Sequence, residues 1–462
     1  MVKIPDVKLR DVSEGIIQAV DSSIAPPNSV YLSSNFWFHK DMGRATLREG
    51  ITQLGDTISG TCQGLYQFIL SSGSQKLLAV FDNKIHSLET ATWTNRTAVT
   101  ASATARFATY LDTVVMVDGT LAKSSTNGTS WVTTGGNFDV ANMPKGKYVI
   151  EWKDKIYTAG VSGEPDRLYF SSLPITGAVS WTDATAGYID ISPEDGSGSI
   201  VGLSKVPGYL LIFKERTIKR WNGQSTFPED LINIGTTSQE AIVFARQTVF
   251  FWNSRGIFET NGGYPRKISR RIEDIVNAVG SSYSVSGWSD KDNVYFSVGD
   301  ITLDGLTIKN CVVAYNIDTQ TWALFSFPQD FKKWHTYVSS GEHLIAGDTT
   351  GKVWKVFDGT ADGTANIEWL LQYQTQEFGH RARYKDLSKI ILLTDAINSG
   401  TVSIRSEAED FQPFGTFNQD ISVIRGHKRG RYFDFRLFGS GRGGEIIGLE
   451  IPDSAINITQ EV

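Results

Sequence analysis

The sequence has little of what marks a disulfide-stapled, membrane-spanning or nucleic-acid-coating protein. It holds two cysteines in 462 residues, Cys62 and Cys311, and their spacing excludes a disulfide framework and disfavours a structural zinc site. We expect both to be small buried residues with free thiols. No window approaches the roughly 18 apolar residues of a membrane-spanning helix, and the N-terminus lacks the apolar region of a secretory signal. We therefore expect no membrane-spanning segment and a chain made in a reducing compartment.

Basic residues are outnumbered as well. Lysine and arginine total 44 against 50 aspartates and glutamates, a net charge of −6, which excludes a globally basic nucleic-acid coat and leaves room only for local basic patches. Hydrophobic residues at 40% and charged residues at 20% exclude a disordered chain. What is abundant is glycine, with 44 residues against 13 prolines, and aromatic residues, at 11%. This composition is typical of many short strands joined by tight turns.

Residues 56–366 look like one strand hairpin after another. Segments such as 76–82, 208–223 and 311–325 are short, rich in β-branched and aromatic residues, and bounded by glycine, asparagine, aspartate or serine. A loose hairpin motif recurs at intervals of roughly 35–55 residues, which is typical of propeller blades of about four strands. We predict an all-β fold with a β-propeller of six or seven irregular blades over 56–366. An array of β-sandwiches is the alternative.

The C-terminal part of the chain changes character. Strands in residues 367–462 are longer and separated by longer loops, and segment 432–438 alternates between aromatic or aliphatic and mostly polar residues. We predict a separate C-terminal β-sandwich domain over 367–462.

The first 55 residues show neither pattern. Pro26 and Pro27 exclude a helix and predict a stiff, extended stretch over 24–30. We predict that residues 1–55 form an extended N-terminal arm with the first strands, lying over another domain or a neighbouring subunit.

Helix signals are sparse. The best lies at 268–279, where Ile272, Ile275, Val276 and Val279 recur at helical spacing and Ser269 stands at the position of an N-cap. We predict one short helix there and a low helix content overall.

Motifs that carry catalysis are missing. None of the six histidines lies in an HExxH pattern, and no GxSxG, Walker or dinucleotide-binding motif occurs. The glycine-rich stretch 439–444 joins two predicted strands, so we expect a connecting loop rather than a phosphate cradle. We predict that the chain is not an enzyme and uses no cofactor and no metal.

One segment resembles the Asp-box turn of sialidases and related propellers. In residues 124–131 the positions of Ser124, Gly128 and Trp131 match that pattern, whereas Thr126 stands where the aspartate belongs and Ser130 replaces the threonine. The box is a structural turn, so it favours a propeller and is silent on hydrolysis. A sialidase-like glycan hydrolase is an alternative function.

A basic cluster occurs at 425–431. Its charged residues could contact phosphate in a salt-sensitive way, or form a solvated hairpin loop or an interface with acidic residues of a neighbour, and we favour the last two. Its members are Arg425, His427, Lys428, Arg429 and Arg431.

Three stretches together resemble the tail nozzle, or packaged-DNA-stabilising tail hub, of short-tailed phages. They are 24–55, 208–223 and 234–276. The third stretch carries the most specific pattern, a glycine and serine, then an Asn-x-x-Gly-Ile-Phe turn, then a Lys-Ile-Ser-x-x-Ile helix. The matching residues are Gly235, Ser238, Asn253, Gly256, Ile257, Phe258, Ser269 and Ile272.

The resemblance implies a structural virion protein and not an enzyme. Such proteins are propellers with an additional β domain that form a homo-hexameric ring below the portal and adaptor proteins. They line the channel for packaged double-stranded DNA, help retain that DNA, and attach tail fibre, spike or needle proteins. A negative channel wall would let DNA slide, because phosphate and carboxylate repel.

The resemblance places this chain in the virion tail, after synthesis in the bacterial cytoplasm. A receptor-binding tail adhesin, which should have an aromatic-lined carbohydrate groove, is another alternative. We expect subunit or tail-protein contacts at Pro26, Pro27, Asn28, Arg44, Arg425, His427, Lys428, Arg429 and Arg431.

Overall fold

The structure is a computed structural model of an all-β protein, as predicted. No helix among the residues it describes is long and apolar enough to cross a bilayer. It describes residues 6–21, 24–134, 136–175, 177–192, 194–281, 284–379, 382–397, 399–407 and 409–458.

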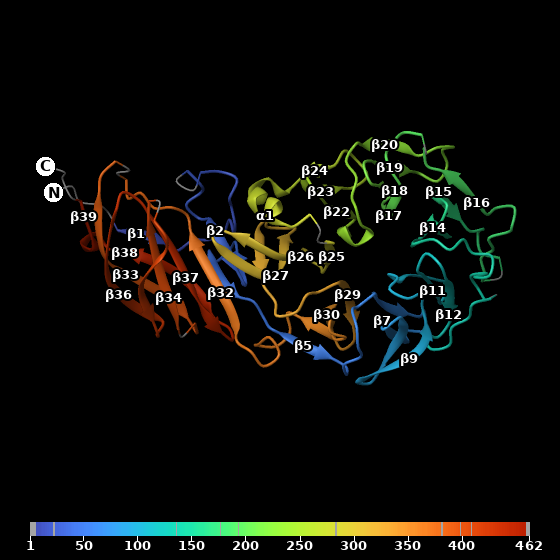
Figure 1. Ribbon diagram of the computed structural model, residues 1–462, viewed down its shortest axis with the longest axis horizontal. Helices are drawn as coiled ribbons and strands as arrows, with labels where there is room; N and C mark the ends of the chain where they lie inside the picture. Colours follow the sequence, from blue (N-terminus) through green and yellow to red (C-terminus); the bar gives the residue numbers. More distant parts are fainter. Residues whose placement is uncertain are drawn as a thin grey trace.

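Residues 51–356 form seven small antiparallel sheets, which we call the seven-sheet body (Figure 1). Six of these sheets use three or four consecutive strands, and the seventh adds β5, from the start of this body, to three strands from its end. Sheet by sheet, the strands are β6 (Gly64–Ile69), β7 (Gln75–Phe81), β8 (Lys84–Glu89) and β9 (Thr92–Ala98); β10 (Arg106–Tyr110), β11 (Thr113–Val117) and β12 (Ala122–Ser125); β13 (Tyr148–Trp152), β14 (Lys155–Val161), β15 (Glu164–Phe170) and β16 (Gly187–Asp190); β17 (Ile200–Val206), β18 (Tyr209–Lys214), β19 (Ile218–Trp221) and β20 (Glu229–Ile232); β21 (Ile242–Ala245), β22 (Thr248–Asn253), β23 (Gly256–Thr260) and β24 (Arg266–Lys267); β25 (Ser286–Ser289), β26 (Asn293–Leu303), β27 (Leu306–Asn316) and β28 (Trp322–Phe325); and β29 (Lys333–Val338), β30 (Glu342–Gly347), β31 (Val353–Val356) and β5 (Ile51–Leu54).

The first strands of successive sheets lie beside one another. β6 contacts β10, and the contacts continue through β13, β17, β21 and β25 to β29, which in turn contacts β6. Figure 1 shows the seven sheets following one another around a common centre, on the right of the molecule. Strand β5 hydrogen-bonds to β31, so both ends of this body lie in one sheet.

Strands from both ends of the chain build two larger sheets, which we call the two-sheet body, on the left in Figure 1. One sheet has the order β3-β4-β38-β33-β36, with β1 beside β38 and β39 beside β33, and the other has the order β2-β32-β37-β34-β35. The bounds are β1 (Val7–Leu9), β2 (Val30–Ser34), β3 (Phe36–His39), β4 (Arg44–Leu47), β32 (Ile367–Tyr373), β33 (Lys385–Asp395), β34 (Gly400–Ser406), β35 (Gln412–Phe417), β36 (Ile421–Gly430), β37 (Phe433–Gly441), β38 (Glu445–Ile451) and β39 (Ile456–Ile458).

The alternation predicted for 432–438 is confirmed in β37. Phe433, Phe435 and Leu437 are fully buried on one face. The glycine-rich stretch 439–444 runs from the end of β37 toward β38, so it connects two strands as expected.

The predicted helix lies at its predicted place but is shorter. A 3-10 turn, η2 (Ser269–Ile272), leads into α1 (Glu273–Ala278), and Ile272, Ile275 and Val276 are buried. The predicted cap is wrong: the hydroxyl oxygen of buried Ser269 accepts a hydrogen bond from the N–H of Ile257, at 3.0 Å, so it serves β23 and not the helix. Two other 3-10 turns are η1 (Gln239–Ala241) and η3 (Asp453–Ala455).

Both cysteines are buried and carry free thiols, as predicted. Burial raises the pKa of the Cys62 thiol to about 12 and raises that of Cys311 as well, which keeps both thiols neutral.

Two chain segments cross between the bodies, and they run side by side. Residues 48–50 lead from β4 to β5, and 357–366 lead from β31 back to β32. The N–H of Gly50 donates to the carbonyl of Gly359, and the N–H of Ile51 to that of Ala361. A Cβ on Gly50 would lie 2.0 Å from the Ala361 carbonyl oxygen, so only glycine permits this crossing.

Arg48 fixes the crossing from inside. Its side chain is fully buried, and its two terminal nitrogens donate to the two Asp362 oxygens at 2.8 and 2.7 Å. Its Nε donates to Asn35 Oδ1 at 2.8 Å, and Nη2 also donates to the Ser326 carbonyl. The guanidinium lies 4.2 Å from the centroid of the Phe327 ring. Because each nitrogen of the Arg48 guanidinium donates to a fixed acceptor, this cluster holds the two bodies in one orientation.

Candidate functional site

The N-terminal candidate residues lie in a turn and a strand of the two-sheet body. Pro26, Pro27 and Asn28 occupy a turn in which the N–H of Ser29 donates to the Pro26 carbonyl at 3.0 Å, so the predicted extended stretch over 24–30 is wrong. Proline fixes φ near a value that suits a turn as well as a strand. Both prolines are exposed. Arg44, in β4, forms an ion pair with Glu445 of β38 at 3.3 Å.

The basic cluster 425–431 is not a loop, because the strand β36 continues through it to Gly430. The reason is a pair of glycines at inward-facing positions. A Cβ on Gly426 would lie 2.8 Å from the Phe414 ring, and one on Gly430 would lie 2.6 Å from the Ser406 side chain. With no side chain at either site, the other sheet approaches closely and the strand stays paired with β33.

β36 is the edge strand of its sheet, and its outward face is exposed at every second residue. Ile421 and Val423 are 63% and 52% exposed, which is unusual for large apolar side chains on a regular strand. The basic residues Arg425, His427 and Arg429 continue the same face. Figure 1 places β36 at the end of the molecule that lies farthest from the seven-sheet body.

The basic residues near β36 differ in their partners. Lys428 pairs with Glu409 at 2.6 Å, Arg431 with Glu407 at 2.9 Å, and His427 lies 3.4 Å from Asp386. Arg429 lies over the Tyr384 ring. Arg425 has no ion pair among the described residues.

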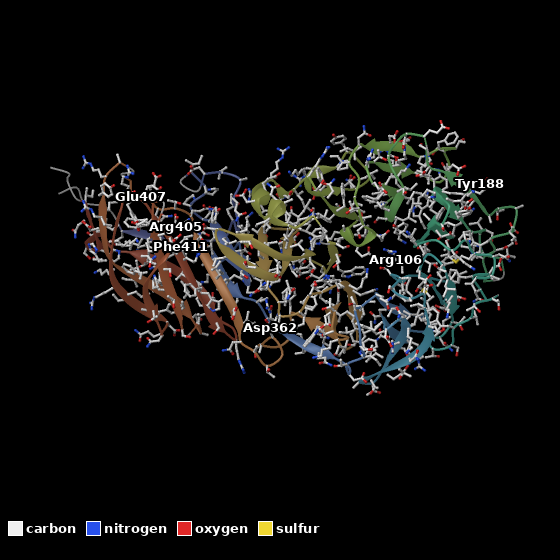
Figure 2. All side chains as sticks on the ribbon, viewed as in Figure 1. Arg106, Tyr188, Asp362, Arg405, Glu407 and Phe411 are labelled. Carbon is white, nitrogen blue, oxygen red and sulfur yellow. The ribbon has the colours of Figure 1, made fainter. Side chains whose placement is uncertain are left out.

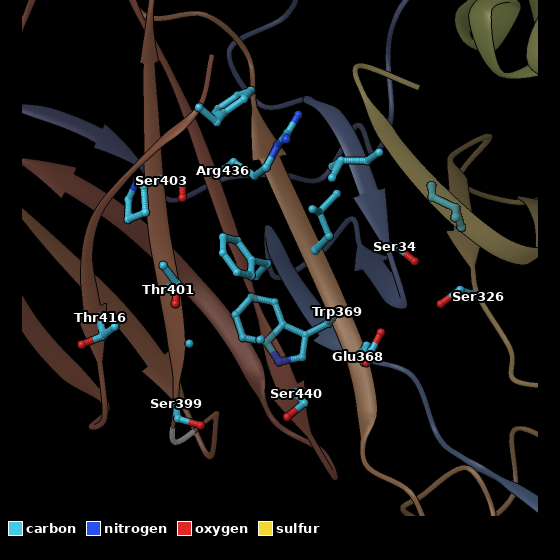
Figure 3. A pocket seen from close by; sticks show the side chains of 18 of the residues that line it. Ser34, Ser326, Glu368, Trp369, Ser399, Thr401, Ser403, Thr416, Arg436 and Ser440 are labelled. Atoms are coloured by element: carbon cyan, nitrogen blue, oxygen red, sulfur yellow. The ribbon is translucent and has the colours of Figure 1, made fainter. Parts of the chain in front are cut away.

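A groove of about 1000 Å³ runs over the outer face of β32, β37 and β34 (Figure 3). The register places cross-strand neighbours in rows: Leu370, Phe438 and Thr401 form one row, and Gln372, Arg436 and Ser403 the next. Phe438 is 40% exposed in the middle of this floor.

The long hairpin of β26 and β27 forms one wall of the groove. Its tip residue Asp304 accepts hydrogen bonds from Arg405 at 2.8 Å and from Arg436 at 2.9 Å, which ties the hairpin to the floor. Both guanidiniums also lie over the Phe411 ring, at 4.5 and 3.7 Å from its centroid; Figure 2 labels Arg405 and Phe411 in the two-sheet body. Burial lowers the pKa of Arg436, and Asp304 opposes that shift.

A charged cluster near the centre of the seven-sheet body, where Figure 2 labels Arg106, joins the first strands β10 and β29 to the 3-10 turn η1 that precedes β21. Glu240 accepts from Arg106 at 2.6 Å and from Lys333 at 2.9 Å. Burial alone would raise the pKa of Glu240, but Lys333 and Arg106 outweigh it and hold the pKa well below its usual range. The cluster is therefore an internal ion-pair network that joins η1 to the sheets of β10 and β29, which are not adjacent in the order of sheets.

The Asp-box-like segment forms the turn that its sequence predicts. Ser125 Oγ accepts from the N–H of Gly128 at 2.9 Å, and Asn127 Oδ1 accepts from the N–H groups of Thr129 and Ser130 at 2.8 Å. Asn127 supplies the turn-forming side chain; it follows Thr126, which stands where the aspartate of the pattern belongs.

No group of three or more metal-ligating side chains gathers anywhere in the described ranges. The features with potential for binding are the outward face of β36 and the groove.

Sequence reasoning did not find the groove. The alternation in 432–438 places Arg436 and Phe438 on one face, and a similar alternation in 400–406 places Thr401 and Ser403 on one face. The alternation within each strand does not give the register between two strands more than 30 residues apart. The cross-strand rows of the groove floor therefore follow only from the sheet of the structure.

No family model matches the chain, and no curated protein matches its sequence. Among solved structures, the extracellular domain of BT4673 from B. thetaiotaomicron is 8% identical with a TM-score of 0.46, over 86% of this chain and 58% of that one. BBS1N, in complex with ARL6DN, is 11% identical with a TM-score of 0.41, over 67% of this chain and 96% of that one. The CNH domain of AfRom2 is 13% identical with a TM-score of 0.38, over 66% and 99%.

Proposed function

We propose that this chain is a structural subunit of a short-tailed phage tail, a nozzle or hub that assembles as a homo-hexameric ring below the portal. Its seven-sheet body is a seven-bladed β-propeller, and its two-sheet body is a β-sandwich built from both chain ends. The succession of first strands from β6 to β29 and back to β6 supports the propeller. The pairing of β5 with β31 would close the ring of blades, because it places strands from both ends of the body in one sheet.

The observation that carries the proposal is the edge of β36. An exposed edge strand with unpaired backbone groups and large apolar side chains would promote aggregation in a free monomer. Ile421 and Val423 are both more than half exposed there. A subunit that buries this edge against a neighbour accounts for it, and the sequence resemblance to tail nozzles supplies the kind of assembly.

Charge on β36 favours a head-to-tail contact over a twofold one. If two β36 strands paired antiparallel about a twofold axis near their middle, Arg425 would face its own copy, and like charges opposite each other are destabilising. A heterologous contact avoids this repulsion, and it makes a closed ring when its rotation closes. The exposed turn at Pro26 and Pro27 is a second candidate contact.

The assembly is tested by mass photometry and negative-stain imaging of the full chain, alone and mixed with its portal complex. We expect a sixfold ring with an axial opening, either alone or only on the portal. A monomer or trimer that ignores the portal would contradict the nozzle.

A receptor-binding adhesin is the second candidate. The observation that favours it is the groove, because its floor presents the partly exposed ring of Phe438. An adhesin would form trimers and bind host glycans whether or not a portal is present. We keep the prediction that the chain is not an enzyme under either function.

A further inference from the structure

We propose that the groove between the β26–β27 hairpin and the two-sheet body binds a neutral oligosaccharide. The inference does not depend on the ring assembly; it names the ligand class for the groove on which the second candidate function, the adhesin, rests. It rests on the chemistry of the groove floor, on the state of its polar groups and on the pairing of the three floor strands on both sides.

The polar groups of the floor are free to bind a ligand. Within the described part of the chain, the hydroxyls of Thr401, Ser403, Thr416 and Ser440 and the carboxylate of Glu368 have no side-chain hydrogen-bond partner. Figure 3 shows these groups distributed along the groove from β35 to β32. Hydroxyls both donate and accept, so the array matches the hydroxyl groups of a sugar chain.

The centre of the floor is aromatic. Phe438 is flanked in its row by Leu370 on β32 and Thr401 on β34, and its ring is 40% exposed. A sugar ring has one apolar face of C–H groups, which packs on an aromatic ring while the sugar hydroxyls reach the polar groups around it. Pockets that combine an apolar surface with a few placed polar groups are the usual ligand sites.

The cations beside the groove are already neutralised. Arg436 and Arg405 pair with Asp304, Arg405 pairs also with Asp434, and Lys309 pairs with Asp300 at 2.7 Å. An anionic ligand would find no free positive charge among the described lining residues. Glu368, which is exposed, disfavours an anion further and accepts from hydroxyl groups. The site therefore selects an uncharged polar ligand.

An extended peptide is the poorer fit. Each of β32, β37 and β34 has a strand on both sides, so their backbone groups are paired in the sheet. A peptide that binds by strand addition needs an open edge, and these three strands offer none, because the open edge of the sheet lies at β35, at the margin of the groove. At about 1000 Å³ the groove has the volume for several linked sugar rings.

The test uses the full chain and isothermal titration calorimetry. The probes are maltohexaose, cellohexaose, laminarihexaose, chitohexaose and dextran, with dextran sulfate as the anionic counterpart of dextran. We expect at least one neutral probe to bind. Phe438→Ala should weaken that binding about tenfold by removing the stacking surface, and Thr401→Val should weaken it by removing a hydroxyl without changing shape.

Phe244→Ala is the matched control, because Phe244 is 46% exposed on strand β21 of the other body. It should bind the probe as the unaltered chain does, and all variants should keep the same thermal midpoint. Failure of every neutral probe to bind at millimolar concentration would overturn the proposal. So would unchanged affinity in Phe438→Ala, or tighter binding of dextran sulfate than of dextran. None of these results bears on whether the ring assembles.

Discussion

His335 shows how one partly buried side chain can make the stability of the fold sensitive to pH. Its Nδ1 lies 2.8 Å from the Thr336 carbonyl, and the N–H of Gln67 donates to its Nε2 at 3.3 Å. The ring also packs against Trp288, with centroids 4.6 Å apart. These contacts require a neutral imidazole with its proton on Nδ1, because a second proton on Nε2 would face the N–H of Gln67.

We expect acid to destabilise the protein through this histidine. Burial lowers the pKa of His335 to about 4, below the ordinary value of 6.5. Between those values the unfolded chain binds a proton that the folded chain does not, so the free energy of unfolding falls as the pH falls from 6.5 to 4, by up to about 3 kcal/mol. Denaturant unfolding of the protein and of His335→Gln across this range measures the difference. Parallel pH profiles would contradict it.

At the scale of the element, β36 has one face that packs inside the fold and one exposed face, which we propose for association. Its inward positions carry Gly426 and Gly430, which let the neighbouring sheet approach. Its outward positions carry Ile421 and Val423, followed by basic residues. The inward face packs against the neighbouring sheet, whereas no part of the described chain covers the outward face.

A charge on the outward face should block assembly and leave the fold intact. We expect Val423→Lys, alone or with Ile421→Lys, to raise the dissociation constant of the proposed ring on the order of tenfold or more, since a lysine at a strand edge disfavours pairing with another chain. Sedimentation velocity measures this. Phe244→Lys, on an exposed position of β21, is the control and should assemble normally. Normal rings from the β36 variants would exclude this edge as the contact.

At the scale of the whole molecule, the two bodies behave as one unit because they share a core and a buried ion pair. Trp37 of β3 packs on Phe325 of β28, with centroids 4.5 Å apart, and on Phe357 of the crossing segment at 5.2 Å. The Arg48–Asp362 pair lies at the same junction. The ring that we propose needs this rigidity, because a flexible junction would not set one rotation between neighbours.

Breaking the buried pair should loosen the junction. We expect Arg48→Met or Asp362→Asn alone to lower the free energy of unfolding by about 3–5 kcal/mol. The first variant leaves the buried Asp362 carboxylate without its partner, and the second leaves the buried Arg48 guanidinium without a charged partner. The double variant Arg48→Met/Asp362→Leu should lose less than the sum of two such losses. Denaturant titration measures stability, and limited proteolysis should cut the single variants within 357–366. Single variants as stable and as resistant as the original protein would refute this role.

The sequence by itself determined the local features of the protein. The all-β class, the short helix near residues 269–278, the alternation of β37 and the burial of Cys62 all follow from near neighbours in the chain. Propensity and periodicity act over a few residues, so a single sequence can carry them.

The tertiary structure alone decided the features that join distant residues. Arg48 meets Asp362 across 314 positions, and Asp304 meets Arg405 across 101. The groove floor depends on the register of three strands, and β36 continues past residue 425 because its inward glycines face Phe414 and Ser406. Such pairings are selected by the whole core, since a slip of one residue would turn every side chain to the opposite face.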